Sequence, residues 1–193
     1  MALVRLVDID ELEGAPRAVA DSGNAQYGQL LNTWRAIMNR PEMFETYLPF
    51  LRKVAGPGVL DQKLKDLCAL YVGVLNHCRY TASHRSTSAL KNGVDETTLV
   101  QAAIGDWASF DERTRIALEF TKELTLNPAE LEYSDLPQAV ASEVLASLKN
   151  NFSDAEIVDL AMTVAMWNAL ARFHRVMGFE LDMPEAPKGV NPK

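Results

Sequence analysis

Helical periodicity runs through nearly the whole sequence and constrains the fold more than any other feature. Apolar residues recur at intervals of three and four, and capping residues, prolines and glycines mark the ends of the helices. Asp61 is placed to cap one helix, and Gly93 is placed to end the next in the left-handed conformation. The expected helices cover residues 24–39, 41–55, 61–75, 78–93, a short stretch after 95, 109–124, 137–149 and 153–177. Only residues 1–7 suit a short strand, so the sequence predicts an all-α fold.

The same pattern predicts one helical domain over residues 1–180. Residues 181–193 are rich in proline and polar residues, and we expect a loose C-terminal tail there. A faint internal repeat suggests that the domain is a duplicated helical unit. At an offset of 93 positions, Asp61, Asp66, Leu67 and Arg79 match Asp154, Asp159, Leu160 and Arg172.

Composition and charge exclude several classes of function. The net charge of −7 and the absence of a basic cluster argue against binding to nucleic acid. The longest uncharged apolar run, residues 160–171, is too short to span a membrane, and the N-terminus does not resemble a signal peptide. Two cysteines ten positions apart do not make a disulfide framework. We therefore expect a cytoplasmic protein without nucleic-acid or membrane partners.

One segment carries a recognisable motif. "LKDLCALYVGVLNHCRYTASHRSTSALKNGV", residues 64–94, resembles the carboxymuconolactone decarboxylase and alkyl hydroperoxidase D-like superfamily. That family has an acidic residue, then Cys-x-x-Cys after eleven intervening residues, then His and a closing Gly. Here Asp66 takes the acidic position and Cys78 the first cysteine, whereas Thr81 replaces the second cysteine and Arg85 the histidine. His84 lies one position early.

The resemblance extends to the flanking segments and carries several implications. It implies an alkyl hydroperoxidase D-like helical bundle that assembles into dimers, trimers or hexamers. It also implies one of two activities, thiol-based reduction of hydroperoxides or cofactor-free decarboxylation of a small lactone acid. The apolar run "VDLAMTVAMWNAL" independently favours a homo-oligomer, because this helix needs cover on more than one side.

Cys78 and Thr81 bear on the choice between these activities. A thiol at a helix start is favoured as the thiolate, although a small buried thiol packed in the core fits the same pattern. A dithiol peroxidase needs a second thiol to resolve the sulfenic acid, and Thr81 cannot supply one. Of the possible peroxidase mechanisms, the sequence therefore leaves only one that uses Cys78 alone, with an external thiol as the reductant.

Arg85 and His84 point in different directions on an ideal helix. Arg85 lies about 20° from Cys78 around the helix axis, and His84 about 120° away. Arg85 is therefore predicted to face a site beside Cys78, where its guanidinium would hold a carboxylate. An exposed ion pair for Arg85 and a surface or core position for His84 are the structural alternatives.

Three further residues are candidates for the site. Asp66 would orient Arg85 or carry a proton if the two helices bring them together, and otherwise it is an exposed acid. Tyr80 and Thr81 offer hydroxyl groups to a substrate, although a helical tyrosine is more often part of the core. The internal repeat also places His174 as a counterpart of Thr81. No histidine or cysteine pair has metal-ligand spacing, so we expect neither a metal nor a cofactor.

Three hypotheses about function remain open at the level of sequence. The first is a cofactor-independent decarboxylase or lyase for a small acidic metabolite, with catalytic residues among Cys78, Arg85, His84 and Asp66. The second is a peroxidase that reduces a hydroperoxide with Cys78 alone. The third is a non-catalytic oligomer that binds a ligand.

Overall fold

The computed structural model describes residues 2–190, and their regular structure is helical. This part of the chain forms one 3₁₀ helix and nine α-helices. They are η1 (Ile9–Glu11), α1 (Gly14–Tyr27), α2 (Asn32–Ile37), α3 (Pro41–Ala55), α4 (Gln62–Leu75), α5 (Arg79–Lys91), α6 (Glu96–Ile104), α7 (Glu112–Glu130), α8 (Ser142–Asn151) and α9 (Asp154–Met177). Residues 2–190 contain no strand, which confirms the predicted all-α fold.

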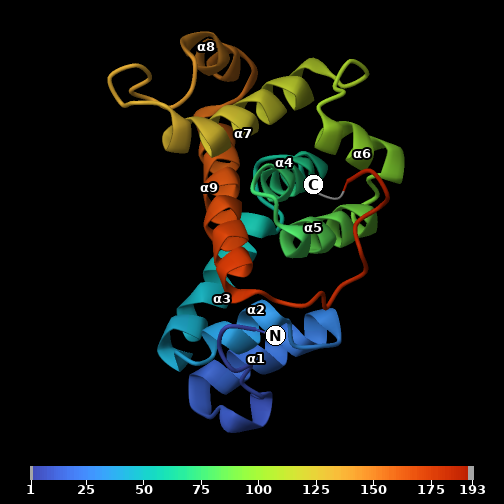
Figure 1. Cartoon of the computed structure of the whole chain (residues 1–193), viewed down its shortest axis with the longest axis vertical. Helices are drawn as coiled ribbons and strands as arrows, with labels where there is room; N and C mark the ends of the chain where they lie inside the picture. The colour runs from blue at the N-terminus through green and yellow to red at the C-terminus, as the bar shows by residue number, and fades with distance from the viewer. Residues whose placement is uncertain (1, 191–193) are drawn as a thin grey trace.

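Helix α4 lies at the centre of the larger group of helices. It packs against α5, α6, α7 and α9, and α9 also packs against α3, α5 and α7. Figure 1 shows α7 crossing one end of α9, while α1, α2 and α3 gather at the other end. The main core is built around α4, and a second apolar cluster joins α1, α2 and α3. The described chain therefore has a large helical body with an N-terminal cap of helices.

The sequence of α4 explains its central position. Its residues from Leu64 to Gly73 are buried on all sides of the helix, and even Lys65 is only 1% exposed. The Lys65 ammonium donates to Asp159 Oδ1 at 2.9 Å and to the carbonyl of Gly56 at 2.9 Å. These contacts satisfy the buried charge and join α4 to α9 and to the end of α3.

Capping residues begin or end several helices as expected. Asp61 accepts a hydrogen bond from the Leu64 amide at 3.1 Å and starts α4. Ser153 and Glu156 form a capping box at the start of α9. Gly178, with a φ of 64°, ends that helix in the left-handed conformation.

Helix boundaries differ from the expectation in the N-terminal region. A single helix was expected over residues 24–39, with Ser22 as its cap. Instead, Ser22 lies inside α1, which ends at Gly28 with a φ of 72°. Because glycine adopts this left-handed conformation without a steric penalty, Gly28 stops α1 before the short helix α2 begins.

Two later helix starts also differ. The helix expected from Pro137 begins only at Ser142, because Ala139 has a φ of 57°, which is incompatible with a right-handed helix. Asp111, rather than Ser109, caps α7 and accepts from the Thr114 amide at 3.0 Å. In both cases the residue that sets the helix start lies within a few positions of the expected one.

The segment after α9 was expected to be a loose tail over residues 181–193. Its described part, up to residue 190, runs past α2 and along α5 toward α6 (Figure 1). Ala186 and Val190 are buried in the main core, at 6% and 1% exposure. The Ser83 hydroxyl on α5 also donates to the Pro184 carbonyl at 2.7 Å. The irregular segment is therefore packed; residues 191–193 lie outside the described part.

Candidate active site

The junction between α4 and α5 brings the motif residues together. His77 adopts a φ of 52° in the turn, and Cys78 follows as the N-cap of α5, where its sulfur accepts from the Thr81 amide at 3.4 Å. The two helices approach closely at Gly73, where an added Cβ would lie 3.0 Å from Thr81 Cγ2. A residue without a side chain is therefore needed at Gly73 to seat the first turn of α5 against α4.

A cavity of about 450 Å³ lies beside α5. Its walls come from α1, α2, α3, α4, α5, α9 and the C-terminal segment. The side chains that carry chemistry there are Tyr27, Thr33, Tyr47, Arg52, Gln62, His84, Arg85, Ser88, Lys91, Asn92 and Trp167. The two predicted site residues on this wall are His84 and Arg85. They occupy it together, although the ideal-helix geometry had favoured Arg85 alone.

Asp182 holds His84 in place. His84 Nε2 lies 2.5 Å from Asp182 Oδ1, and the other carboxylate oxygen accepts from the Tyr80 hydroxyl and the Asn32 amide, both at 2.6 Å. Burial favours a raised pKa for Asp182, but these hydrogen bonds, with the one from His84 foremost, hold that pKa below its usual value. Tyr80 thus contacts Asp182 rather than the cavity, which places this predicted substrate-binding residue behind the wall.

The protonation of His84 follows from the same contacts. Burial lowers the pKa of His84, while the hydrogen bond and charge of Asp182 oppose that shift. At neutral pH the imidazole is therefore neutral and donates Nε2–H to the Asp182 carboxylate. Nδ1 then carries the lone pair, so it is the ring atom that can exchange a proton.

Arg85 is buried with incomplete hydrogen bonding. Its guanidinium lies over the Trp167 ring at 4.1 Å, and one terminal nitrogen is 3.7 Å from Asp66 Oδ1. Burial lowers the pKa of Arg85 from a high starting value, and Asp66 opposes the shift. Asp66 also accepts from Ser88 at 3.3 Å and Asn92 at 2.5 Å. Asp66 is therefore buried beside Arg85 rather than exposed.

The cavity concentrates polar atoms that have no partner. Among the described residues, five of the seven buried side-chain atoms without a hydrogen bond belong to residues that line it. These atoms are Tyr47 Oη, Arg52 Nε, Gln62 Oε1, Arg85 Nε and Trp167 Nε1. Four of the five can donate a hydrogen bond. Because unpaired buried donors are costly, these atoms are available to acceptor oxygens of water or of a ligand in the cavity.

Basic side chains carry the charge on the cavity wall. Arg52, Arg85 and Lys91 line the cavity, whereas no carboxylate among residues 2–190 does. This basic wall belongs to a chain with a net charge of −7. The local field therefore favours an anionic ligand even though the whole molecule repels one.

Cys78 lies behind the cavity in a buried hydrogen-bonded chain. Its sulfur is 3.2 Å from Thr81 Oγ1, which is 2.8 Å from His174 Nδ1. His174 Nε2 in turn lies 2.9 Å from Thr33 Oγ1, and Thr33 lines the cavity. Burial lowers the pKa of His174 to about 3, so its ring is neutral. Cys78 itself is only 2% exposed.

The second cysteine is separate from this chain. Cys68 is fully buried in the core of α4, and burial raises its pKa to about 12. Both Cys68 and Cys78 are free thiols. Within residues 2–190 there is also no group of three or more histidine, cysteine or carboxylate side chains that could hold a metal ion.

The structure therefore divides the predicted site residues into two groups. His84 and Arg85 line the cavity, whereas Asp66, Cys78, Tyr80 and Thr81 support it from behind. Sequence reasoning missed Asp182, because it lies in a segment without periodicity. The internal repeat had raised His174, and it does contact Thr81. None of the helices in the described chain has the length and apolar character that crossing a bilayer requires.

Comparison with known protein families finds a match over the segment that contains the motif. Residues 41–123 match the model of the carboxymuconolactone decarboxylase family. This match covers α3, α4, α5 and α6 and most of α7. No curated protein sequence matches the chain significantly.

Several solved structures share the fold. One is the alkylhydroperoxidase AhpD core of an uncharacterized peroxidase-related protein from Ralstonia eutropha JMP134, with a TM-score of 0.75, 17% identity, and coverage of 100% of this chain and 98% of that chain. A peroxidase-related protein from Silicibacter sp. TM1040 has a TM-score of 0.70 and 19% identity, covering 97% of this chain and 94% of that one.

A third similar structure comes from a different type of enzyme. It is a variant of the debrominase Bmp8 with a cysteine replaced by alanine, in complex with 2,3,4-tribromopyrrole. Its TM-score is 0.75 at 20% identity, and the match covers 98% of this chain and 97% of that chain. Because these identities are low, the structural likeness shows a shared fold. Residues 41–123 are therefore similar to the carboxymuconolactone decarboxylase family, and the chain as a whole shares the helical fold of these alkylhydroperoxidase AhpD-like structures.

Proposed function

We propose that the protein is a cofactor-independent lyase that decarboxylates a small carboxylate or lactone acid. The observation that carries this proposal is the presence of His84 and Arg85 together on one cavity wall, with His84 hydrogen-bonded to Asp182 at 2.5 Å. This pairs a group that exchanges protons with a fixed positive charge. The unpartnered donors, and a wall to which the described residues contribute no carboxylate, support an anionic substrate.

In the proposed mechanism, Arg85 stabilises negative charge on the substrate. The carbon–carbon bond to the carboxylate breaks, CO₂ leaves, and the electron pair moves toward a conjugated carbonyl oxygen. Arg85 binds that oxyanion through donors such as its unpartnered Nε. Fixed donors in a buried site act strongly on a developing charge, because no solvent has to reorganise.

His84 then supplies the proton that replaces CO₂. A bound anion favours protonation of its Nδ1, while Asp182 stabilises the resulting imidazolium through Nε2–H. The imidazolium delivers the proton to carbon and returns to its neutral form. Asp66 and Trp167 hold the guanidinium of Arg85 in position throughout.

The proposal is tested by measuring CO₂ release from a panel of unsaturated lactone acids and small conjugated carboxylates. Wild type, Arg85→Ala, His84→Ala and Cys78→Ser are assayed in parallel. We expect the wild type to turn over a substrate, Arg85→Ala and His84→Ala to lose this activity, and Cys78→Ser to retain it. If no substrate releases CO₂, but an anion binds and Arg85→Ala abolishes its binding, the protein is a binding protein rather than a lyase.

A peroxidase that uses Cys78 alone is the second candidate, favoured by the chain from Cys78 through Thr81 to His174. The Cys78 thiolate would attack the peroxide, break the O–O bond and form a sulfenic acid plus an alcohol, and an external thiol would then reduce the sulfenic acid. It ranks second because the pKa of about 3 makes His174 a weak base, and because Cys78 is buried. Cumene hydroperoxide turnover that disappears in Cys78→Ser but survives in Arg85→Ala would favour it.

A further inference from the structure

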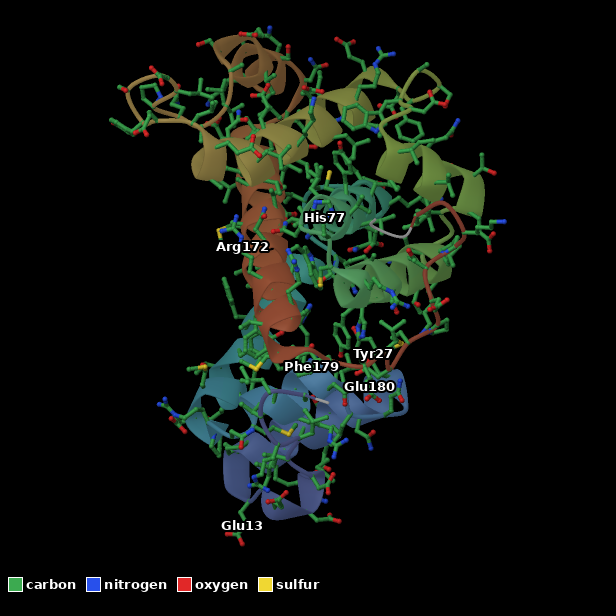
Figure 2. All side chains as sticks on the ribbon, in the orientation of Figure 1. Glu13, Tyr27, His77, Arg172, Phe179 and Glu180 are labelled. Carbon is green, nitrogen blue, oxygen red and sulfur yellow. The ribbon has the colours of Figure 1, made fainter. Side chains whose placement is uncertain are left out.

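Helix α9 has one face that no other part of the described chain covers. Figure 2 shows Arg172 projecting from this face, on the side of α9 that lies away from α4 and α5. The exposed residues on the face are Ala155, Val158, Met162, Ala165, Ala169, Arg172 and Val176. Val158 and Val176 are each 62% exposed, and Met162 is 40% exposed.

These seven positions follow a regular repeat. They are separated alternately by three and four residues, so that positions recur every seven residues along six turns of helix. All but Arg172 are apolar. A solvated helix face normally carries charged side chains, whereas an apolar seam with this spacing is the pattern by which two helices pack along their length.

The residue sizes along the seam distinguish between the two possible orientations of a second identical helix. In an antiparallel pair with its two-fold axis beside Ala165, Met162 would lie opposite Ala169, and Val176 opposite Ala155. Met162 and Val176 then each meet an alanine, and Val158 lies opposite the aliphatic stem of Arg172. A parallel pair would instead place each methionine, valine and arginine against its own copy, with two Arg172 charges in contact.

Charges beside the seam favour the same orientation. Asp154 stands at the start of α9 and Arg175 near its end, each next to a seam residue. In the antiparallel pair, Asp154 of each copy lies opposite Arg175 of the other. Asp154 now pairs with Lys149 at 2.9 Å and is 88% exposed, and Arg175 donates to the Asn76 carbonyl at 3.2 Å. Both side chains are exposed enough to reach a neighbour.

We propose that two copies of this chain associate through the apolar seam of α9 in an antiparallel, two-fold arrangement. The seam lies on the opposite side of α9 from Trp167, which lines the cavity, so both cavities stay open in the dimer. The self-complementary sizes and charges identify the occupant as a second copy, because an isologous interface requires a surface that matches itself.

Engineered disulfides test the orientation directly. Ala165→Cys lies beside the two-fold axis and should give a disulfide-linked dimer under mild oxidation, seen by non-reducing electrophoresis. Ala155→Cys is the matched control, because its two copies would be about 31 Å apart at 1.5 Å per residue. Mixing Ala155→Cys with Val176→Cys should give a mixed dimer. The native cysteines are both buried and do not interfere. Cross-linking of Ala155→Cys as readily as Ala165→Cys would overturn the antiparallel arrangement.

Charge reversal with light scattering provides an independent test. Wild type is expected to have the mass of a dimer at micromolar concentration, and Asp154→Lys and Arg175→Glu should each weaken the dimer at least tenfold. The double variant should recover most of the affinity, and circular dichroism checks that all variants remain helical. A monomeric wild type, or a double variant no tighter than either single one, would refute the proposed interface.

Discussion

The two neighbouring residues Arg85 and His84 differ in how the chain holds them. Asp66 and Trp167 hold the charged guanidinium, whereas Asp182 fixes the neutral imidazole. A permanent charge and a proton-exchanging group therefore reach one cavity from adjacent positions of α5. Each can be altered separately, which makes their roles testable.

Arg85→Ala should lower turnover of a substrate found by screening at least about a hundredfold, or roughly 2.7 kcal/mol of barrier. The reason is that the fixed charge stabilises the oxyanion of the transition state. Arg85→Lys should recover activity only in part, because an ammonium lacks the planar fork of donors. Steady-state kinetics measures both variants, with circular dichroism as the control for folding. Full activity in Arg85→Ala would remove the basis for this role.

Asp182→Asn should lower kcat by at least about tenfold and change KM less. The substitution leaves the cavity wall in place but removes the charge that stabilises the His84 imidazolium. Asp182 raises the pKa of His84, so its loss should move the pH profile that depends on His84 to lower pH. The measurement is kcat and KM from pH 5 to 9. An unchanged pH profile with lower activity would indicate that Asp182 is structural only.

At the scale of elements, His174 connects three helices. It lies on α9, and its two ring nitrogens contact Thr81 on α5 and Thr33 on α2. The chain buries this ring in its neutral form, with a pKa of about 3. One contact between the N-terminal helices and the main body is therefore made by an imidazole that is uncharged at neutral pH.

This burial predicts a loss of stability on acidification. The unfolded chain binds a proton at His174 below pH 6.5, whereas the folded chain does not until about pH 3. The contribution of His174 to the free energy of unfolding is fully present above pH 6.5. It decreases by at most about 1.4 kcal/mol per pH unit as the pH falls toward 3. Urea unfolding at pH 7, 6 and 5 measures it, and His174→Gln should flatten the slope, with a residual from His84. An equal slope in both proteins would contradict the assignment.

At the scale of the whole molecule, the C-terminal segment joins parts that are far apart in sequence. It brings Asp182 to His84 on α5, and the same Asp182 carboxylate accepts a hydrogen bond from the Asn32 amide in the N-terminal helices. Figure 2 shows Phe179 and Glu180 at the point where this segment leaves α9 and passes the end of α1 near Tyr27. Farther along, Val190 is buried in the main core. The segment thus completes both the site and the core.

Val190→Ala should therefore lower the free energy of unfolding by about 1–2 kcal/mol, because it removes two buried methyl groups from a side chain that is 1% exposed. For a chain of this size that corresponds to a fall in Tm of roughly 2–8 °C. Thermal unfolding followed by circular dichroism measures it, and Lys188→Ala at an exposed position of the same segment is the control. Equal Tm values for both variants would mean that the segment is loose, as its composition had suggested.

The sequence by itself determined the helical class and many of the helix ends. Asp61, the capping box at Ser153 and Gly178 act on neighbouring backbone groups, and such local interactions can be read from spacing alone. The sequence left open whether Asp66 would be buried near Arg85 or exposed, and packing of α4 against α5 brings the two to 3.7 Å. Where two local signals competed, as at Ser22 and Gly28, the left-handed glycine decided the boundary.

Only the tertiary structure decided which side chains meet in the cavity. Angles on an ideal helix separated His84 from Arg85, but neighbouring elements wrap around α5, so both reach the same space. Asp182 comes from a segment without periodicity, and its position follows from packing against α2 and α5 rather than from any local pattern. Local hydrogen bonds specify helices, whereas a site assembled from distant segments depends on how their surfaces fit together.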